Sequence, residues 1–250
     1  MPKIFPDFTE NKAYYIIILV SVFLGAVIRL NGLGVWTLAL DEYYIIASSE
    51  NILKHGLPQF TNGGYYSRGI LLQYLISFLI SLGIKVEFAG RIFSVIASLI
   101  TIPPIYLIAK RIGNIKIATL AVVIFSFSIW HIEFARFARM YSPFQAIFMW
   151  YIYFALLDFT NKNLNNYKWL LFLSFLSLFV YEGSIFLVVF NFIPFILQRR
   201  INVKYLLFTI FIFVSSIFIN TFGFRKLLSN PRIPPEYLEK IGSQVSNLPI

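Results

Sequence analysis

The sequence predicts an all-α protein, a polytopic bundle of about seven membrane-spanning helices. Two observations indicate this fold class. Hydrophobic residues make up 58% of the chain and charged residues 13%, whereas soluble domains contain about 45–50% apolar and about 25% charged residues. The basic residues also lie in short segments between long apolar runs, the pattern that orients membrane helices. The net charge of +10 is therefore interpreted as membrane topology, and no nucleic-acid partner is expected.

The first predicted span covers residues 14–28. Lys3 and Lys12 precede it, and no small-residue cleavage site follows, so the segment is interpreted as an uncleaved membrane anchor. Lys and Arg favour the cytoplasmic side of a span. This rule places the N-terminus in the cytoplasm and residues 31–87 outside, as the first extracytoplasmic loop of a plasma-membrane protein.

Two helices that lie at the membrane interface are predicted within this loop, near residues 45–53 and 69–82. The second run has about fourteen residues, and about twenty are needed to cross a bilayer. If it crossed, the basic residues near Lys110 would lie outside, against the positive-inside rule. The first helix is preceded by Asp41 and Glu42, and a helix N-terminus favours anionic groups.

The remaining spans follow from the same alternation of apolar runs and basic loops. They are expected at residues 88–108, 117–130 and 143–157, twice within 169–197 with a turn near 181–183, and at 203–222. The membrane module is thus expected to cover residues 1–222. Residues 223–250 are expected to form an extracytoplasmic tail or the start of a truncated C-terminal part.

This topology gathers carboxylates and arginines on the outer side of the membrane. They are Asp41, Glu42, Glu50, Glu87, Glu133 and Glu182, with Arg68, Arg91, Arg136 and Arg139. A carboxylate can deprotonate an acceptor hydroxyl, and guanidinium groups hold phosphates through a planar fork. Together with a lipid-facing wall, these groups suit a phosphosugar linked to a lipid.

The second outer loop, residues 131–143, concentrates this chemistry. If it continues as a helix, Glu133, Arg136 and Arg139 fall on one face at i, i+3 and i+6. Such a face would present two guanidinium groups and a carboxylate to a substrate at the membrane surface.

Each candidate also has a plain structural alternative. Asp41 can cap the helix that follows it, and Arg91 can be a snorkelling interface anchor. Arg136 and Arg139 can bind lipid headgroups or pair with Glu133. Glu182 can simply mark an outer turn. His131 and Glu133 can be metal ligands, but a solvated face is the favoured interpretation, because the sequence offers no further clear histidine ligand.

Several motifs resemble the membrane module of the GT-C glycosyltransferases, most closely the protein O-mannosyltransferase and aminoarabinose-transferase-like group. They are Arg29-Leu-x-x-Leu, Leu40-Asp-Glu-Tyr-Tyr44, Ala89-Gly-Arg-x-x-Ser94, Ala109-Lys-Arg-Ile-Gly113 and Ala138-Arg-Met-Tyr-Ser142. The resemblance covers about residues 14–200. It implies that Asp41 is the catalytic base, that Glu42 shapes the acceptor or donor site, and that Arg91 contacts the donor phosphate.

The remaining candidates for binding the donor phosphate or another part of the substrate are Arg136, Arg139, Tyr141, Arg68, Glu133 and Glu182. No metal site is predicted. Many relatives carry a carboxylate near the Ala-Arg-Met-Tyr motif, but Phe137 and Ser142 stand at those positions here, and the chain has no cysteine. A divalent metal is therefore disfavoured, and no cofactor is assigned.

The sequence thus predicts a membrane glycosyltransferase that moves a sugar from a polyprenyl-phosphate donor to a hydroxyl or amine acceptor. The acceptor would belong to a protein or a lipid at the extracytoplasmic face. The alternative is a non-catalytic membrane protein: a small transporter, a scaffold, or an inactive truncated homologue. A transporter typically carries mid-span charges or matched broken helices, and a scaffold needs no cluster of acids and arginines on one side.

Overall fold

A computed structural model describes residues 11–60, 65–66, 68–161, 165–198 and 203–221. Within these residues the chain is helical, and an isolated bridge between Gln59 and Tyr65 is the one piece of β pairing. The α-helices are α1 (Lys12–Leu30), α2 (Leu40–His55), α3 (Ile70–Ser81), α4 (Val86–Ile100), α5 (Ile102–Ile112), α6 (Ile115–Phe127), α7 (Ile129–Ala135), α8 (Tyr141–Asn161), α9 (Tyr167–Leu178), α10 (Ile185–Phe190), α11 (Ile193–Gln198) and α12 (Val203–Thr221), with a 3-10 turn η1 (Glu182–Ser184). The predicted all-α class is confirmed.

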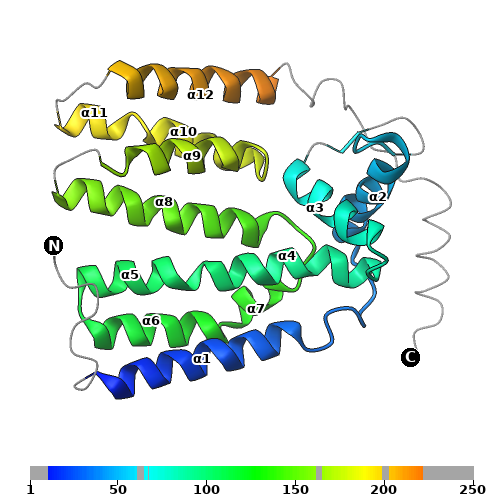
Figure 1. Cartoon of the computed structure of the whole chain (residues 1–250), viewed down its shortest axis with the longest axis horizontal. Coiled ribbons are helices and arrows are strands. Elements are labelled where there is room, and N and C mark those ends of the chain that lie inside the picture. The colour runs from blue at the N-terminus through cyan, green and yellow to red at the C-terminus, as the bar shows by residue number, and fades with distance from the viewer. Residues whose placement is uncertain (1–10, 61–64, 67, 162–164, 199–202, 222–250) are drawn as a thin grey trace.

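The helices form parallel rows with a cap of two helices at one end (Figure 1). From one side to the other the rows are α1, α6, α5 with α4, α8, α9, the broken α10–α11 pair, and α12. Helices α2 and α3 pack against each other beside the outer part of α4, apart from the rows. This cap corresponds to the two interface helices expected in the first loop.

Two described helical stretches are long and apolar enough to cross a membrane, Lys12–Leu30 and Val86–Ile112. Helices α6 and α7 would make a third span that is bent by 57° at Ser128. Several shorter apolar helices, among them α9 and α12, run parallel to these spans on the far side of α8. A helical membrane bundle is therefore supported, and the count of seven spans stays a prediction.

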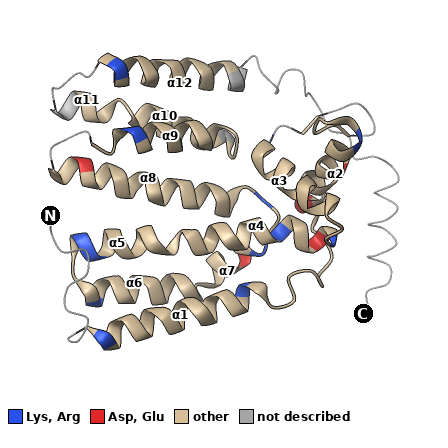
Figure 2. Cartoon of the chain, in the orientation of Figure 1, with Lys and Arg blue, Asp and Glu red and all other residues tan. Residues whose placement is uncertain are grey.

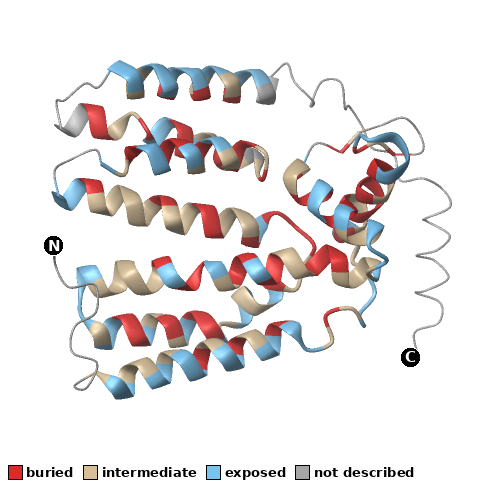
Figure 3. Cartoon of the chain, in the orientation of Figure 1, coloured by how far each residue is buried: buried red, intermediate tan, exposed pale blue. Residues whose placement is uncertain are grey.

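Charged side chains gather at the two ends of the rows and leave the middle apolar (Figure 2). One end carries mostly Lys and Arg, whereas the carboxylates, with Asp158 as an exception, lie near α2, α4 and α7. Large hydrophobic side chains such as Leu207, Phe208 and Phe211 on α12 are exposed, and exposed positions are frequent on the two outermost rows (Figure 3). An apolar middle with charged ends is the surface that a bilayer requires.

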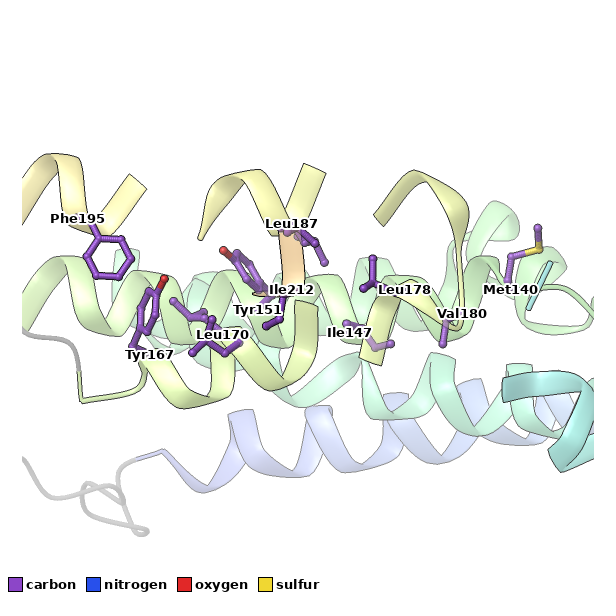
Figure 4. Packing of buried hydrophobic residues seen from close by; sticks show 12 residues of the cluster. Met140, Ile147, Tyr151, Tyr167, Leu170, Leu178, Val180, Leu187, Phe195 and Ile212 are labelled. Atoms are coloured by element: carbon purple, nitrogen blue, oxygen red, sulfur yellow. The ribbon is translucent and has the colours of Figure 1, made fainter. Parts of the chain in front are cut away.

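The largest buried cluster joins α8, α9, α10, α11 and α12 (Figure 4). It includes a chain of hydrogen bonds, in which the Tyr151 hydroxyl donates to Asn191 Oδ1 at 2.9 Å and the Tyr167 hydroxyl donates to the Asn191 carbonyl at 2.6 Å. Asn191 follows the end of α10. Tyr167 therefore satisfies a backbone carbonyl where the helix is interrupted inside the apolar region.

Arg29 fixes the first span to two others. Its side chain is fully buried and donates to Ser98 Oγ at 3.1 Å and to the carbonyls of Ser126 and Phe125 at 2.8 and 3.2 Å. These two carbonyls lie in the last turn of α6, where carbonyls lack helical partners and a positive charge is favoured. Arg29 thus stabilises the end of α6 at the bend that directs α7 toward the α2 end.

Candidate active site

Asp41 and Glu42 occupy the first turn of α2 and face opposite environments. Ala39 is the N-cap residue, so the alternative in which Asp41 caps the helix is not what the structure shows. Neighbouring helical residues point about 100° apart. The Asp41 side chain is 60% exposed, whereas the Glu42 side chain is 1% exposed. The two carboxylates are therefore available for different tasks.

The Glu42 carboxylate is saturated with hydrogen bonds. Its Oε1 accepts from Arg91 Nε and from the Ala138 backbone N–H, both at 2.8 Å. Its Oε2 accepts from Arg91 Nη2 at 2.7 Å and from the Ala39 backbone N–H at 2.9 Å. Glu42 therefore joins the loop before α2, the helix α4 and the loop after α7 at one point.

Arg91, on α4, is equally occupied. Besides the two bonds to Glu42, its Nη1 donates to the carbonyls of Leu33 and Trp36 at 3.0 and 2.9 Å, and its Nη2 donates to the Thr37 carbonyl at 3.0 Å. A guanidinium has five N–H donors, and these contacts use all of them. At 5% exposure, Arg91 is not a snorkelling anchor. A direct contact with a donor phosphate stays a prediction, and it would require some of these bonds to break.

The close approach of these segments depends on Gly90. A Cβ atom at this position would lie 2.5 Å from Ile46 Cδ1 on α2 and 3.1 Å from Ala138 Cβ. The absence of a side chain therefore lets α2 and the loop after α7 reach α4 beside Arg91. The Ala-Gly-Arg sequence is thus explained by packing as well as by charge.

Asp41 belongs to a second cluster with Arg139, Tyr66 and Arg68. Arg139 Nη2 lies 3.3 Å from Asp41 Oδ2, and its Nη1 donates at 2.9 Å both to the Asp41 carbonyl and to the Tyr66 hydroxyl. Burial raises the pKa of Tyr66, while the charges of Arg139 and Arg68 act in the opposite direction. The Tyr66 oxygen accepts from Arg139, so its own proton is free for donation to another group.

Residues 131–143 do not continue as one helix, so the condition for a shared face of Glu133, Arg136 and Arg139 is not met. Helix α7 stops at Ala135, and Arg136 is its C-terminal capping residue. After the helix ends, the chain changes direction and brings Arg139 to Asp41. Glu133 and Arg136 instead line a separate cavity of about 290 Å³, together with Trp36, Glu42 and Arg91. The three residues therefore do not share a face, and Arg139 pairs with Asp41 rather than with Glu133.

The other predicted site residues lie around these two clusters. Tyr141 begins α8, and the Arg139 guanidinium lies 5.7 Å from its ring centroid. Arg68 is exposed in the turn before α3. Glu182 begins η1, but its side chain lies outside the described residues. In the part of the chain that the structure describes, no group of three or more His, Asp or Glu side chains could hold a metal ion.

An apolar groove begins near the N-terminal end of α8. Its volume is about 310 Å³, and its walls come from α3, α4, α8 and α9, including Leu72, Pro143, Ala146 and Trp150. Pro143 lies two residues after Tyr141, and Trp150 donates from Nε1 to the Ile100 carbonyl at the end of α4. The groove therefore runs from the polar end of the molecule along α8 into the apolar middle.

A comparison with known protein families shows to which family the chain belongs. The sequence pattern of the dolichyl-phosphate-mannose-protein mannosyltransferases matches residues 67–222, more than half of the chain. The chain belongs to this family. This mannosyltransferase-family protein is accordingly a membrane glycosyltransferase. The matched region includes Arg91 and Arg139, whereas Asp41 and Glu42 precede it. No curated protein and no solved structure is significantly similar to the chain.

Sequence reasoning missed two features of this glycosyltransferase. It did not pair Glu42 with Arg91, which lie 49 positions apart, and it gave Tyr66 no role. A signal for Tyr66 existed, because this phenol lies two residues before Arg68 and close to the apolar run of α3, at the predicted interface. No local signal identifies the carbonyls of residues 33–37 that surround Arg91.

Proposed function

We propose that this glycosyltransferase moves a sugar from a polyprenyl-phosphate carrier to an acceptor hydroxyl or amine at the extracytoplasmic face, with Asp41 as general base. The observation that carries the proposal is an exposed carboxylate, held by Arg139, together with an apolar groove whose wall starts at Pro143, two residues after the Tyr141 ring that Arg139 contacts. A donor that brings a charged head and a long apolar chain needs both features side by side.

The donor phosphate suits the positive side of the Asp41 cluster. Arg139 places a guanidinium beside the carboxylate, the charge of Arg68 acts on Tyr66, and Tyr66 adds a hydroxyl proton. Arg139 is 4% exposed and its Nε has no hydrogen-bond partner among the described residues. Cationic donors that are fixed in place before the reaction stabilise a phosphate as it leaves.

The polyprenyl chain suits the groove below this cluster. Its walls are almost entirely apolar, and burial of each methylene group from water contributes about 0.8 kcal/mol. Pro143 and Trp150 are seven residues apart on α8, which corresponds to roughly 10 Å of helix. The groove can therefore hold the first isoprene units and leave the phosphate at the polar end.

The chemical step follows from the exposed position of Asp41. Its carboxylate accepts the proton from the acceptor hydroxyl while the acceptor oxygen forms a bond to the anomeric carbon. The bond between that carbon and the phosphate oxygen breaks, and the polyprenyl phosphate leaves with the electron pair beside Arg139. The extracytoplasmic orientation is supported by the carboxylates at this end and by Lys110, Arg111 and Lys116 at the other.

The test is sugar transfer by the full chain in lipid nanodiscs with a polyprenyl-phosphate mannose donor. Asp41→Asn keeps the size of the side chain and removes its basicity, so turnover should fall by about 10²–10⁴-fold. Glu87→Gln is the matched control, because Glu87 lies at the same end and contacts Lys85 at 3.8 Å. Equal turnover in Asp41→Asn and the wild type would remove Asp41 from the mechanism.

A further inference from the structure

The cavity lined by Glu133 and Arg136 lies beside the Glu42–Arg91 pair, and Asp41 is not among its lining residues. The N-cap residue Ala39 and Glu42, in the first turn of α2, form one of its walls. Trp36, Thr37, Leu33 and Phe137 complete the lining, with a volume of about 290 Å³. This size is close to the lower end of small-molecule sites, which is about 300 Å³.

The charges around this cavity balance. Two carboxylates, Glu42 and Glu133, face two guanidiniums, Arg91 and Arg136. Glu42 and Arg91 neutralise each other through two hydrogen bonds. An anionic group such as the donor phosphate therefore gains little here, whereas a neutral ligand meets no net repulsion.

Two side chains in the cavity still have hydrogen-bonding capacity. Arg136 donates one long bond of 3.4 Å from Nη1 to the Ile28 carbonyl, and among the described residues its other N–H groups and the Glu133 carboxylate have no protein partner. A carboxylate accepts from hydroxyl groups and a guanidinium donates to them. Trp36, 69% exposed, adds an aromatic face that can cover the C–H face of a sugar ring.

We infer that this cavity binds one neutral saccharide unit of the acceptor. The assignment of the saccharide to the acceptor rests on the proposed function, because the donor sugar must lie at Asp41. Glu42 forms part of the cavity wall and also fixes the turn that carries Asp41, so a saccharide held here would be anchored next to the reacting group. The acceptor class is then a glycan or glycolipid.

The binding test needs neither donor nor turnover. Methyl mannoside and methyl glucoside are titrated against the full chain in nanodiscs of neutral lipid, with saturation-transfer NMR as the readout, and inorganic phosphate serves as the anionic probe. Glu133→Gln and Arg136→Gln should each weaken glycoside binding by roughly tenfold to a hundredfold, since a hydrogen bond to a charged group is lost. Trp36→Leu should weaken binding, and Trp36→Phe should restore most of it.

Two controls separate this inference from the proposed reaction. Glu87→Gln removes a carboxylate at the same end, and Asp41→Asn removes the base, so both should bind glycosides as the wild type does. Loss of turnover in Asp41→Asn with intact glycoside binding would support both proposals. The inference is overturned if the wild type binds no glycoside, if Glu133→Gln and Arg136→Gln leave binding unchanged, or if phosphate binds at Arg136 instead.

Discussion

Asp41 and Glu42 are chemically similar neighbours, yet their surroundings give them different roles. Glu42 is enclosed by four hydrogen-bond donors, two of them from Arg91. Asp41 keeps an exposed carboxylate beside Arg139. A buried carboxylate that is fully bonded to an arginine holds its structure in place, whereas an exposed one can accept a proton. The geometry therefore favours Asp41 as the residue that accepts a proton, and the Glu42–Arg91 pair as the contact that fixes its position.

Arg91→Lys tests whether Arg91 positions the site or binds phosphate. Lysine has three donors in place of five, and the buried Glu42 would lose the planar fork. Lysine keeps the charge, but each lost hydrogen bond between charged groups costs about 1.5–3 kcal/mol, so the unfolding temperature should fall. The measurement compares thermal unfolding with donor affinity. Weaker donor binding at unchanged thermal stability would show that Arg91 contacts the phosphate directly.

The segment after α7 leaves the helical path that its sequence allows. Arg-Phe-Ala-Arg-Met, residues 136–140, contains no Gly or Pro and has ordinary helix formers. Tertiary bonds override this propensity, because the Ala138 N–H binds Glu42 and Arg139 binds Asp41. Both partners lie nearly a hundred positions earlier in the chain, so the local sequence carries no sign of them. The apolar spans, in contrast, are set by local composition and could be predicted.

The end of α7 at Ala135 predicts different effects for two neighbouring arginines. Arg139→Gln should weaken donor binding by about tenfold or more, because Arg139 lies at the Asp41 cluster. Arg136→Gln should leave donor affinity unchanged, because Arg136 faces the separate cavity. Donor affinity measured by titration in nanodiscs decides the matter, and equal losses in both variants would mean that the two side chains share one surface.

The groove between α3, α4, α8 and α9 predicts a dependence on the donor's lipid chain. Ala146→Phe places a ring in the groove and should weaken binding of a long-chain polyprenyl donor while sparing a short, water-soluble analogue. Phe208→Trp, in a comparable apolar pocket between α9 and α12, is the control. The comparison is the ratio of KM values for the two donors, and the groove is not the lipid site if Ala146→Phe leaves that ratio unchanged.

The whole molecule is organised as an apolar slab with charged ends and a cap of two helices. The sequence could predict this plan because composition and the spacing of basic loops are properties of long segments. It also placed the acidic pair at the start of the first cap helix. The site could be predicted only in outline, because the contacts around Arg91 and Arg139 join four separated segments.

The topology can be checked with single cysteines, since the chain has none of its own. If the cap lies outside, Ser81→Cys at the end of α3 should react with a membrane-impermeant thiol reagent on intact cells. Lys116→Cys, at the start of α6, should react only after the membrane is opened. Both positions are exposed, so access depends on the side of the membrane, and the reverse labelling pattern would show that α3 crosses.

The buried contacts of Arg29 have a consequence for the order in which the chain assembles during synthesis. Its carbonyl partner at Ser126 lies 97 positions later, and at about 5–20 residues per second this separation corresponds to roughly 5–20 s of translation. Before α6 is synthesised, the charge of Arg29 costs less free energy at the lipid–water boundary, where α1 ends, than inside the apolar region. The first span therefore enters the bilayer early but docks late, and α6 completes the docking.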